Sequence, residues 1–222
     1  GYGVFGGCTS LASITVDRDN KNYVEEGGVL LTADRTKLIS AAPGAIGSAY
    51  ALPDTVESIG TGAFCGCRAL MNITMPAGVR FIGKDAFAET GWYDAQPNGL
   101  LMLGSCVIGY RGEMPEGTRL ELAEGTTCIA DFAFDKQLNL VAVSIPASVT
   151  NVGYLAFYNT GVGTVYIEDL DAWCNIYFNN ETYFSPAWRS RGADLYLNGR
   201  GVWKLTIPEG TAKIRRYTFA NI

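Results

Sequence analysis

The chain has 222 residues, a formal net charge of −5 and no histidine. Without histidine it cannot form Ser-His-Asp or Cys-His catalytic groups, and its interspersed charges leave no basic stripe that would track nucleic acid. No apolar run approaches the roughly 18 residues that a membrane-spanning helix requires. We therefore expect neither a nucleic-acid partner nor a membrane span in these residues.

A motif that ends in phenylalanine recurs along the chain. Complete copies end at Phe64, Phe87, Phe134, Phe157 and Phe219, and an incomplete copy opens the chain at Phe5. Phe64 and Phe87 lie 23 residues apart, as do Phe134 and Phe157. Because a unit of this size cannot bury its apolar face alone, the period predicts like-shaped layers stacked with their phenylalanines in a column.

The second complete copy indicates the role of each position. Leu70, Ile73 and Met75 alternate with polar residues, as in a short strand that shows one face to a core, so Asn72 and Thr74 should point outward. The proline that follows ends the strand because it cannot donate to a ladder. Further along, an Ile-Gly step and an Ala-Phe pair alternate large and small residues, which lets thin layers stack without voids.

The copies are first interrupted between residues 17 and 50. Two apolar runs, residues 27–31 and 37–40, flank a polar turn and predict a β-hairpin. Asp17, Asp19 and Asn20 carry oxygen atoms that calcium prefers, but the downstream carboxylate and the turn glycine of a calcium loop are missing. We interpret this segment as a solvated turn and expect no metal.

A second interruption covers residues 91–118. Residues 100–103 and 106–110 surround a Gly-Ser pair, which again predicts a hairpin. Trp92 and Tyr93, just before it, could form a binding platform or cover the apolar layer beneath them. We favour the cover, because large aromatic side chains at a repeat boundary usually pack on apolar layers.

The third interruption, residues 161–203, is rich in aromatic residues. Residues 170–176 are typical of a short helix that starts near Asp169 or Asp171, and residues 195–203 of a strand, a turn and a strand. The aromatic residues are Trp173, Tyr177, Phe178, Tyr183, Phe184, Trp188, Tyr196 and Trp203. Most should be packed core, and the contact surface that we select from this segment is Tyr183, Trp188 and Arg189.

The six cysteines could indicate a disulfide or a metal site. They are Cys8, Cys65, Cys67, Cys106, Cys128 and Cys174. Cys8 and Cys67 stand three residues after a repeat phenylalanine, where other copies have Thr90 and Thr160, so a small side chain packed between layers explains them. Zinc spacing and histidine are both lacking. We favour buried free thiols over a disulfide.

Residues 70–90 and 140–160 carry the pattern L-x-x-I-x-I-P-x-x-V-x-x-I-G-x-x-A-F-x-x-C. The pattern resembles the BspA-like (Treponema pallidum type) leucine-rich repeat of bacterial surface proteins, over nearly the whole chain. The resemblance implies one right-handed leucine-rich-repeat solenoid over residues 1–222, α/β or mainly β. It would have a parallel sheet on one face, short turns or 3-10 segments on the other, and β-hairpin insertions. Both ends fall inside repeats, so we expect a fragment of a longer array.

The outward strand residues would then form a shallow binding surface. On this alignment they are Thr15, Asn72, Thr74, Glu121, Ser144, Tyr166, Tyr196, Lys204 and Thr206, with Ser13 and Ala142 on the same face. Paired carboxylates could also support glycoside hydrolysis. The acidic residues, Asp131 among them, fall mainly in turns where they should be solvated, so we expect no catalytic residues and no cofactor.

Membership of this family would imply a bacterial cell-surface or secreted protein. It would be a monomeric adhesion module that binds host or bacterial surface proteins or glycans. Its weakly charged surface would need multivalent display to bind firmly. Two alternatives stay open: a structural spacer that presents another domain, and a carbohydrate-binding module that uses the aromatic third interruption.

Overall fold

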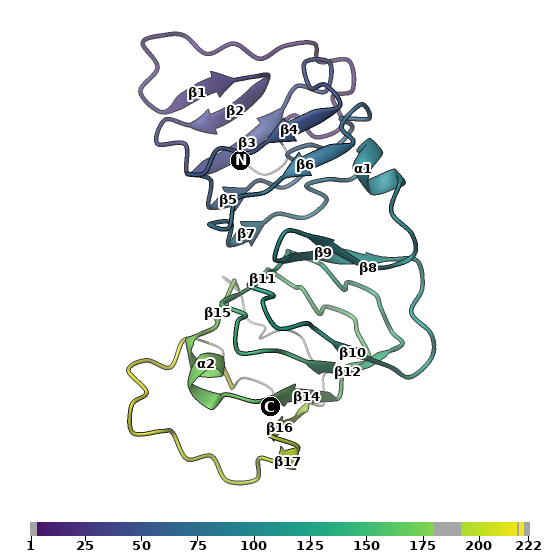
Figure 1. Cartoon of the computed structure of the whole chain (residues 1–222), viewed down its shortest axis with the longest axis vertical. Coiled ribbons are helices and arrows are strands. Elements are labelled where there is room, and N and C mark those ends of the chain that lie inside the picture. Colours follow the sequence, from purple (N-terminus) through teal and green to yellow (C-terminus); the bar gives the residue numbers. More distant parts are fainter. Residues whose placement is uncertain (1–3, 180–191, 217, 220–222) are drawn as a thin grey trace. The chain divides into compact units, whose positions relative to one another are not determined.

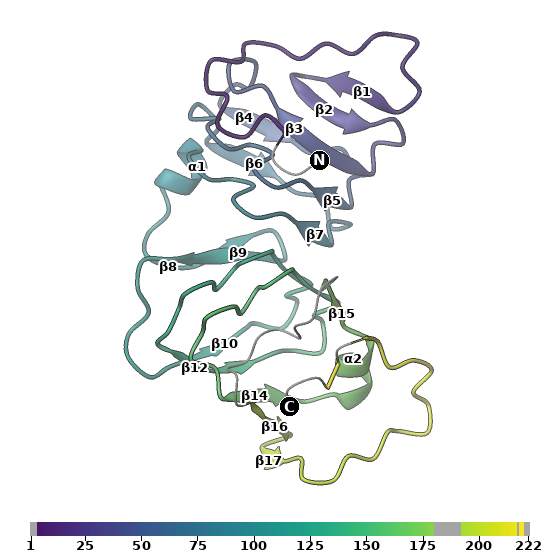
Figure 2. The same ribbon diagram turned by 180° about the vertical axis from the view of Figure 1, so that it is seen from behind.

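The computed structural model describes residues 4–179, 192–216, 218 and 219. Three of the residues selected above, Tyr183, Trp188 and Arg189, lie outside these described residues. The chain divides into two compact units, Gly1–Pro97 and Asn98–Ile222, each described by itself below. Among the described residues, strands dominate both units, and the helices are the short α1 and α2 (Figures 1 and 2).

The first unit contains seven strands in two sheets, and ends with a helix. The strands are β1 Tyr23–Glu26, β2 Val29–Thr32, β3 Lys37–Ala41, β4 Ala49–Ala51, β5 Ser58–Ile59, β6 Asn72–Thr74 and β7 Phe81–Ile82. The larger sheet has the order β1-β2-β3-β5-β7, antiparallel up to β3 and parallel from there on. The smaller pairs β4 with β6 in parallel. Helix α1, Gly91–Asp94, follows its N-cap Thr90, which accepts the backbone N–H of Tyr93 at 3.1 Å.

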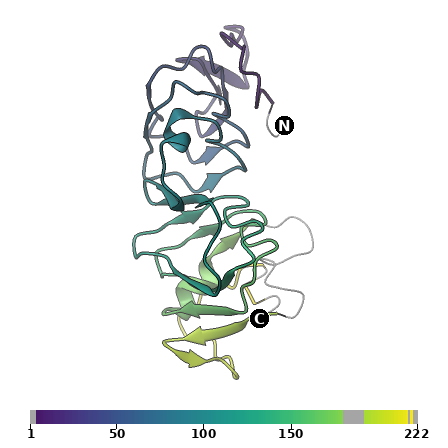
Figure 3. The ribbon, with the colours of Figure 1, turned by 90° about the vertical axis from the view of Figure 1, so that its right-hand side faces the viewer.

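The second unit repeats this plan with two five-stranded sheets. Its elements are β8 Gly99–Leu103, β9 Cys106–Arg111, β10 Thr118–Glu121, β11 Cys128–Ile129, β12 Leu140–Ser144, β13 Asn151–Val152, β14 Thr164–Ile167, α2 Leu170–Asn175, β15 Tyr177–Phe178, β16 Asp194–Leu197 and β17 Arg200–Gly201. One sheet has the order β8-β9-β11-β13-β15 and the other β10-β12-β14-β16-β17. Among the described strands of this unit, only β8 and β17, each at a sheet edge, pair antiparallel with their neighbours. Figure 3 shows strands of this unit one above another.

The stacked layers expected from the period are confirmed within each unit. The rings of Phe64 and Phe87 stack with centroids 5.7 Å apart, and those of Phe134 and Phe157 with centroids 5.1 Å apart. All four side chains are buried. Each phenylalanine therefore packs against the same residue of the next layer, which is what a repeated leucine-rich-repeat turn requires.

A second parallel ladder runs through each unit where turns were expected. The two-residue strands β5, β7, β11 and β13 each end at the Ile or Val of the Ile-Gly step, and the Gly, or Ala130 in one copy, follows the strand. Glycine matters here because the chain passes close to the layer before it. A Cβ atom on Gly83 would overlap the backbone of Thr61, and one on Gly153 the backbone of Asp131.

The elements predicted in the three interruptions are confirmed. The two expected hairpins are β2-β3 and β8-β9, and the expected strand, turn and strand are β16 and β17. Helix α2 begins after Asp169, whose carboxylate accepts the N–H of Ala172 at 3.0 Å. Trp173 fixes the helix to the core of the unit: its side chain is buried and donates its indole N–H to the carbonyl of Thr218 at 3.1 Å.

Two strands implied by the repeat alignment are not formed. Residues 11–17 have no strand, and the carbonyl of Leu11 instead accepts the N–H of Gly44 at 2.9 Å. Residues 202–208 also have no strand. The edge of β16 with which they would pair is occupied by β17, since Tyr196 pairs with Gly201 and Leu197 with Arg200. In the part of the chain that the structure describes, no helix has the length and apolarity to cross a bilayer.

Candidate binding surface

Four of the predicted outward residues lie in one row on the sheet that contains β10, β12, β14 and β16. The register pairs Glu121 with Ser144, Ser144 with Tyr166 and Tyr166 with Tyr196. The residues one position earlier in these strands form the opposite face, where Val143, Val165 and Leu195 are buried. The row therefore faces away from the core, as its alternation with apolar residues predicts.

The other predicted residues are not part of this row. Asn72 and Thr74 are exposed on β6 of the first unit. Thr15, Lys204 and Thr206 are exposed but lie outside the strands. Ala142 is on the same face as Ser144, two positions before it, but it is not an accessible residue as predicted. Its short side chain is 3% exposed between Arg119 and Thr164, its longer partners in register.

The aromatic end of the row is ordered by ring contacts. The rings of Tyr166 and Tyr196 have centroids 5.2 Å apart and are tilted by 43°. Both side chains are half-buried, so each keeps an accessible part on the outer face. Two adjacent strands thus hold two phenol rings in a fixed relation without a flexible loop.

Trp203 extends this aromatic end, and sequence reasoning did not select it for the contact surface. It is 85% exposed. A Cβ atom built on Gly201 would lie 3.1–3.2 Å from atoms of the indole ring. The indole therefore covers Gly201 on the side of the strand toward which a side chain at that position would point. Because Gly201 pairs with Tyr196, this is the outer face of the sheet. The sequence signal for this placement was Gly201, two residues before Trp203, because a residue without a side chain leaves room for the indole ring on the strand.

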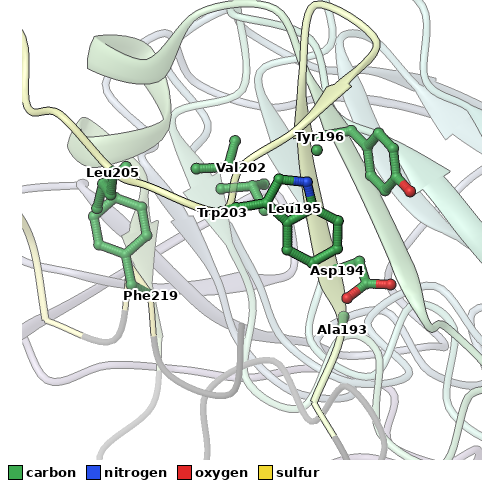
Figure 4. Close-up of a pocket in the computed structure, with 9 residues that line it drawn as sticks. Ala193, Asp194, Leu195, Tyr196, Val202, Trp203, Leu205 and Phe219 are labelled. Carbon is green, nitrogen blue, oxygen red and sulfur yellow. The ribbon is translucent and has the colours of Figure 1, made fainter.

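A pocket of about 320 Å³ lies at this end of the sheet (Figure 4). Its lining combines aliphatic, aromatic and acidic side chains: Ala193, Asp194, Leu195, Tyr196, Gly201, Val202, Trp203, Leu205 and Phe219. Among these described residues Asp194 alone is charged, and it is exposed on the outer face, two positions before Tyr196. The pocket therefore offers apolar walls, two aromatic rings with polar edges and one carboxylate.

Comparison with known families identifies the repeat. The family described as "BspA type Leucine rich repeat region" matches residues 48–94 and 114–222, in six copies. The chain belongs to the BspA-type leucine-rich repeat family. The match leaves out the incomplete copy at Phe5, in keeping with the missing strand at residues 11–17.

Solved structures of bacterial leucine-rich repeat proteins resemble this BspA-type chain. A leucine-rich repeat protein from Eubacterium ventriosum is 23% identical with a TM-score of 0.43, over 76% of this chain and 39% of that one. The pneumococcal vaccine antigen PcpA is 13% identical with a TM-score of 0.35, over 84% and 45%. The Treponema pallidum leucine-rich repeat protein is 19% identical with a TM-score of 0.31, over 79% and 90%. The BspA-type chain thus spans less than half the length of the first two. No curated protein matches it.

The cysteines of the BspA-type chain differ from the expectation of free thiols. Cys106 and Cys128 form a disulfide, because β9 and β11 place them directly opposite each other in register. Their separation of 22 residues, close to one repeat, was the signal that sequence reasoning missed. Cys67 is a buried thiol as expected, and burial together with Cys65 raises its pKa to about 12. Cys8, expected to be buried, is exposed.

Asp131 is an exception among the turn acids. Its side chain is half-buried, and burial raises the pKa of its carboxyl group. The carboxylate accepts the backbone N–H of Tyr154 in the next layer at 2.6 Å, so the hydrogen bond joins two repeats. No cluster of three or more His, Cys, Asp or Glu side chains suited to a metal ion occurs within residues 4–179, 192–216 and 218–219.

Trp92 has the role expected of a cover. The ring of Trp92 meets that of Phe87 edge-on, with centroids 5.8 Å apart. The backbone N–H of Trp92 donates to the backbone carbonyl of Leu70 at 2.7 Å. The tryptophan therefore packs on the last phenylalanine layer of the first unit.

Proposed function

We propose that this leucine-rich-repeat module is a non-enzymatic recognition module of a bacterial surface or secreted protein, and that it binds other proteins. The observation that carries the proposal is the outer row of the second unit, in which Tyr166 and Tyr196 lie in register beside the exposed Trp203. Tyrosine and tryptophan dominate the energetics of protein interfaces. Exposed aromatic residues on a rigid sheet are also ordered before a partner arrives, which lowers the entropic cost of binding.

The polar end of the same row supports a specific role for the surface. Glu121 and Ser144 continue the line of the two tyrosines across β10 and β12. A partner laid across these strands would meet a carboxylate and a hydroxyl at one end and aromatic rings at the other. Since such a row is short, affinity per module would be modest, and display of several modules would raise it.

The disulfide between Cys106 and Cys128 supports export. Disulfides persist in oxidising compartments and are rare in the reducing cytosol. A covalent link between adjacent layers would also stabilise an exported recognition module, because it restricts the unfolded chain. A non-enzymatic role is supported by Asp131, whose half-buried carboxylate accepts a backbone N–H of the next layer and so has a structural use.

Arrays of extracellular-matrix proteins, bacterial surface proteins and glycans test the proposal with the whole chain as the probe. We expect binding to a subset of proteins and no turnover in a broad hydrolase screen. Binding to nothing on the arrays would leave the spacer role. Binding to glycans alone would favour a carbohydrate-binding module, and turnover of any substrate would overturn the non-enzymatic assignment.

A further inference from the structure

We infer that the pocket between β16 and Trp203 binds a cationic side chain, a lysine or arginine of a protein partner. The inference rests on the proposed function and adds to it the chemistry of the group that is recognised. It starts from the composition of the pocket, in which the carboxylate of Asp194 and the rings of Tyr196 and Trp203 share one space of about 320 Å³ (Figure 4).

Trp203 supplies the strongest attraction for a cation. One side of its indole ring covers Gly201, while 85% of the residue stays exposed. A cation within about 6 Å of a ring centroid is attracted by the π-face, and tryptophan is the most favourable ring. Because Gly201 has no side chain, the ring can approach the backbone closely there.

Asp194 supplies the opposite charge. It stands on the outer face of β16, two positions before Tyr196, and is exposed. Neither Arg200 nor Lys204, the next two basic residues along the chain, is among the described residues that line the pocket. Among the described residues of the pocket wall, a cation would thus meet one carboxylate and no positive charge, and the net charge of −5 would favour its approach.

The apolar walls fit the stem of a long basic side chain. Val202 and Leu205 also line the pocket. Lysine and arginine bury their methylene stems along apolar surface while the charged head reaches a polar partner. The pocket is therefore complementary to both halves of such a side chain.

A sugar fits the pocket less well. Among the described side chains that line it, hydrogen bonds come only from the carboxylate of Asp194, the phenol of Tyr196 and the indole N–H of Trp203. A sugar ring carries several hydroxyl groups, and those pressed against the aliphatic walls would be left without partners, which is costly. A cationic head needs only one carboxylate and one open ring face.

The test uses blocked amino acids as probes, titrated into the whole isotope-labelled chain and followed by nuclear magnetic resonance at the indole N–H of Trp203. N-acetyl-arginine methylamide is compared with N-acetyl-citrulline methylamide, which has nearly the same shape without the charge, and with di-N-acetylchitobiose. We expect saturable binding of the arginine probe, at least about threefold tighter than citrulline, and weakening by added salt.

Variants connect the binding to the pocket. Asp194→Asn should weaken arginine binding about three- to fivefold and reduce the preference over citrulline to the part that Trp203 supplies. Trp203→Ala, followed through other backbone signals of β16, should weaken it about two- to fivefold. Asp54→Asn, an exposed acid of the first unit, and Tyr158→Ala, an exposed aromatic residue, are matched controls that should change nothing.

The outcomes separate this inference from the proposed function. Equal binding of arginine and citrulline, tighter binding of the sugar, an unaffected Asp194→Asn variant or no binding of any probe would overturn the cation pocket. If the chain binds proteins on the arrays and both pocket variants bind them equally well, recognition stands and the pocket assignment fails. Arginine binding in a chain that binds nothing on the arrays would keep the pocket and remove the recognition role.

Discussion

The rings of Phe64 and Phe87 lie nearly parallel, with planes 8° apart and centroids 5.7 Å apart, although the residues are one repeat apart in sequence. Both are buried, so each fills the space that the other leaves between layers. The contact repeats in the second unit between Phe134 and Phe157. Stability of each unit should therefore depend on contacts between successive layers, as in other repeat proteins.

Truncation of a phenylalanine should be costly because neighbouring layers cannot collapse into the space. We expect Phe87→Ala to lower the free energy of unfolding by about 3–5 kcal/mol, and Thr74→Ala, on the exposed face of β6, to change it by less than about 0.5 kcal/mol. Urea unfolding followed by circular dichroism measures both. Similar unfolding midpoints for the two variants would contradict the assignment of inner and outer positions.

Much of the fold was predictable because the residue pattern within each repeat determines where its strand lies and which side chains are buried. The apolar alternation at Leu70, Ile73 and Met75 sets which face of a strand is buried, and the recurring phenylalanine sets the period. The same alternation placed Glu121 and Tyr196 on the outer face. These features depend on local pattern, and repetition of the pattern makes them recognisable.

Features set by neighbouring layers were not predictable in the same way. A two-residue strand such as β5 or β7 is too short to show a period, and it exists only because the layer beside it offers a ladder. The pairing of Cys106 with Cys128 depends on the register of β9 against β11. The exposure of Trp203 depends on β17 occupying the edge of β16. Composition alone assigns such cysteines and aromatic residues to the core.

The close approach of layers at Gly153 gives a second prediction. Because a Cβ atom there would overlap the backbone of Asp131, we expect Gly153→Ala to destabilise the second unit by about 1–3 kcal/mol. Gly163→Ala is the control, since the space around its Cβ position is open. Thermal unfolding of both variants checks the difference. A Gly153→Ala variant as stable as the control would mean that the layers can separate at little cost.

The disulfide should stabilise the chain by restricting its unfolded state. It closes a loop of 22 residues, for which the chain-entropy estimate is about 3 kcal/mol. We expect urea unfolding of the wild type to shift to lower urea concentration when a reductant is added, and unfolding of the double variant Cys106→Ala with Cys128→Ala to be insensitive to it. Cys8→Ser, at an exposed free thiol, should retain the shift. A wild type that ignores the reductant would show that the bond does not form.

Asp131 makes stability depend on pH. Burial, the largest influence, raises the pKa of its carboxyl group above the ordinary value of 3.8, while the hydrogen bonds from Tyr154 and Asn179 oppose this shift. The folded chain therefore holds this proton more tightly than the unfolded chain. Its contribution to the free energy of unfolding is most favourable below about pH 4 and declines as the pH rises through the folded-state pKa.

Asp131→Asn removes this titration but keeps an oxygen that can accept the N–H of Tyr154. We expect the variant to gain stability relative to wild type between pH 3 and pH 7, as measured by urea unfolding at each pH. Glu124→Gln, at an exposed turn position, is the control and should show a smaller change with pH. If the Asn variant instead loses stability relative to wild type as the pH rises, the charged form of Asp131 must be the one that the fold prefers. The hydrogen bonds would then outweigh the cost of burial, and the carboxylate would be a favourable link between the two layers.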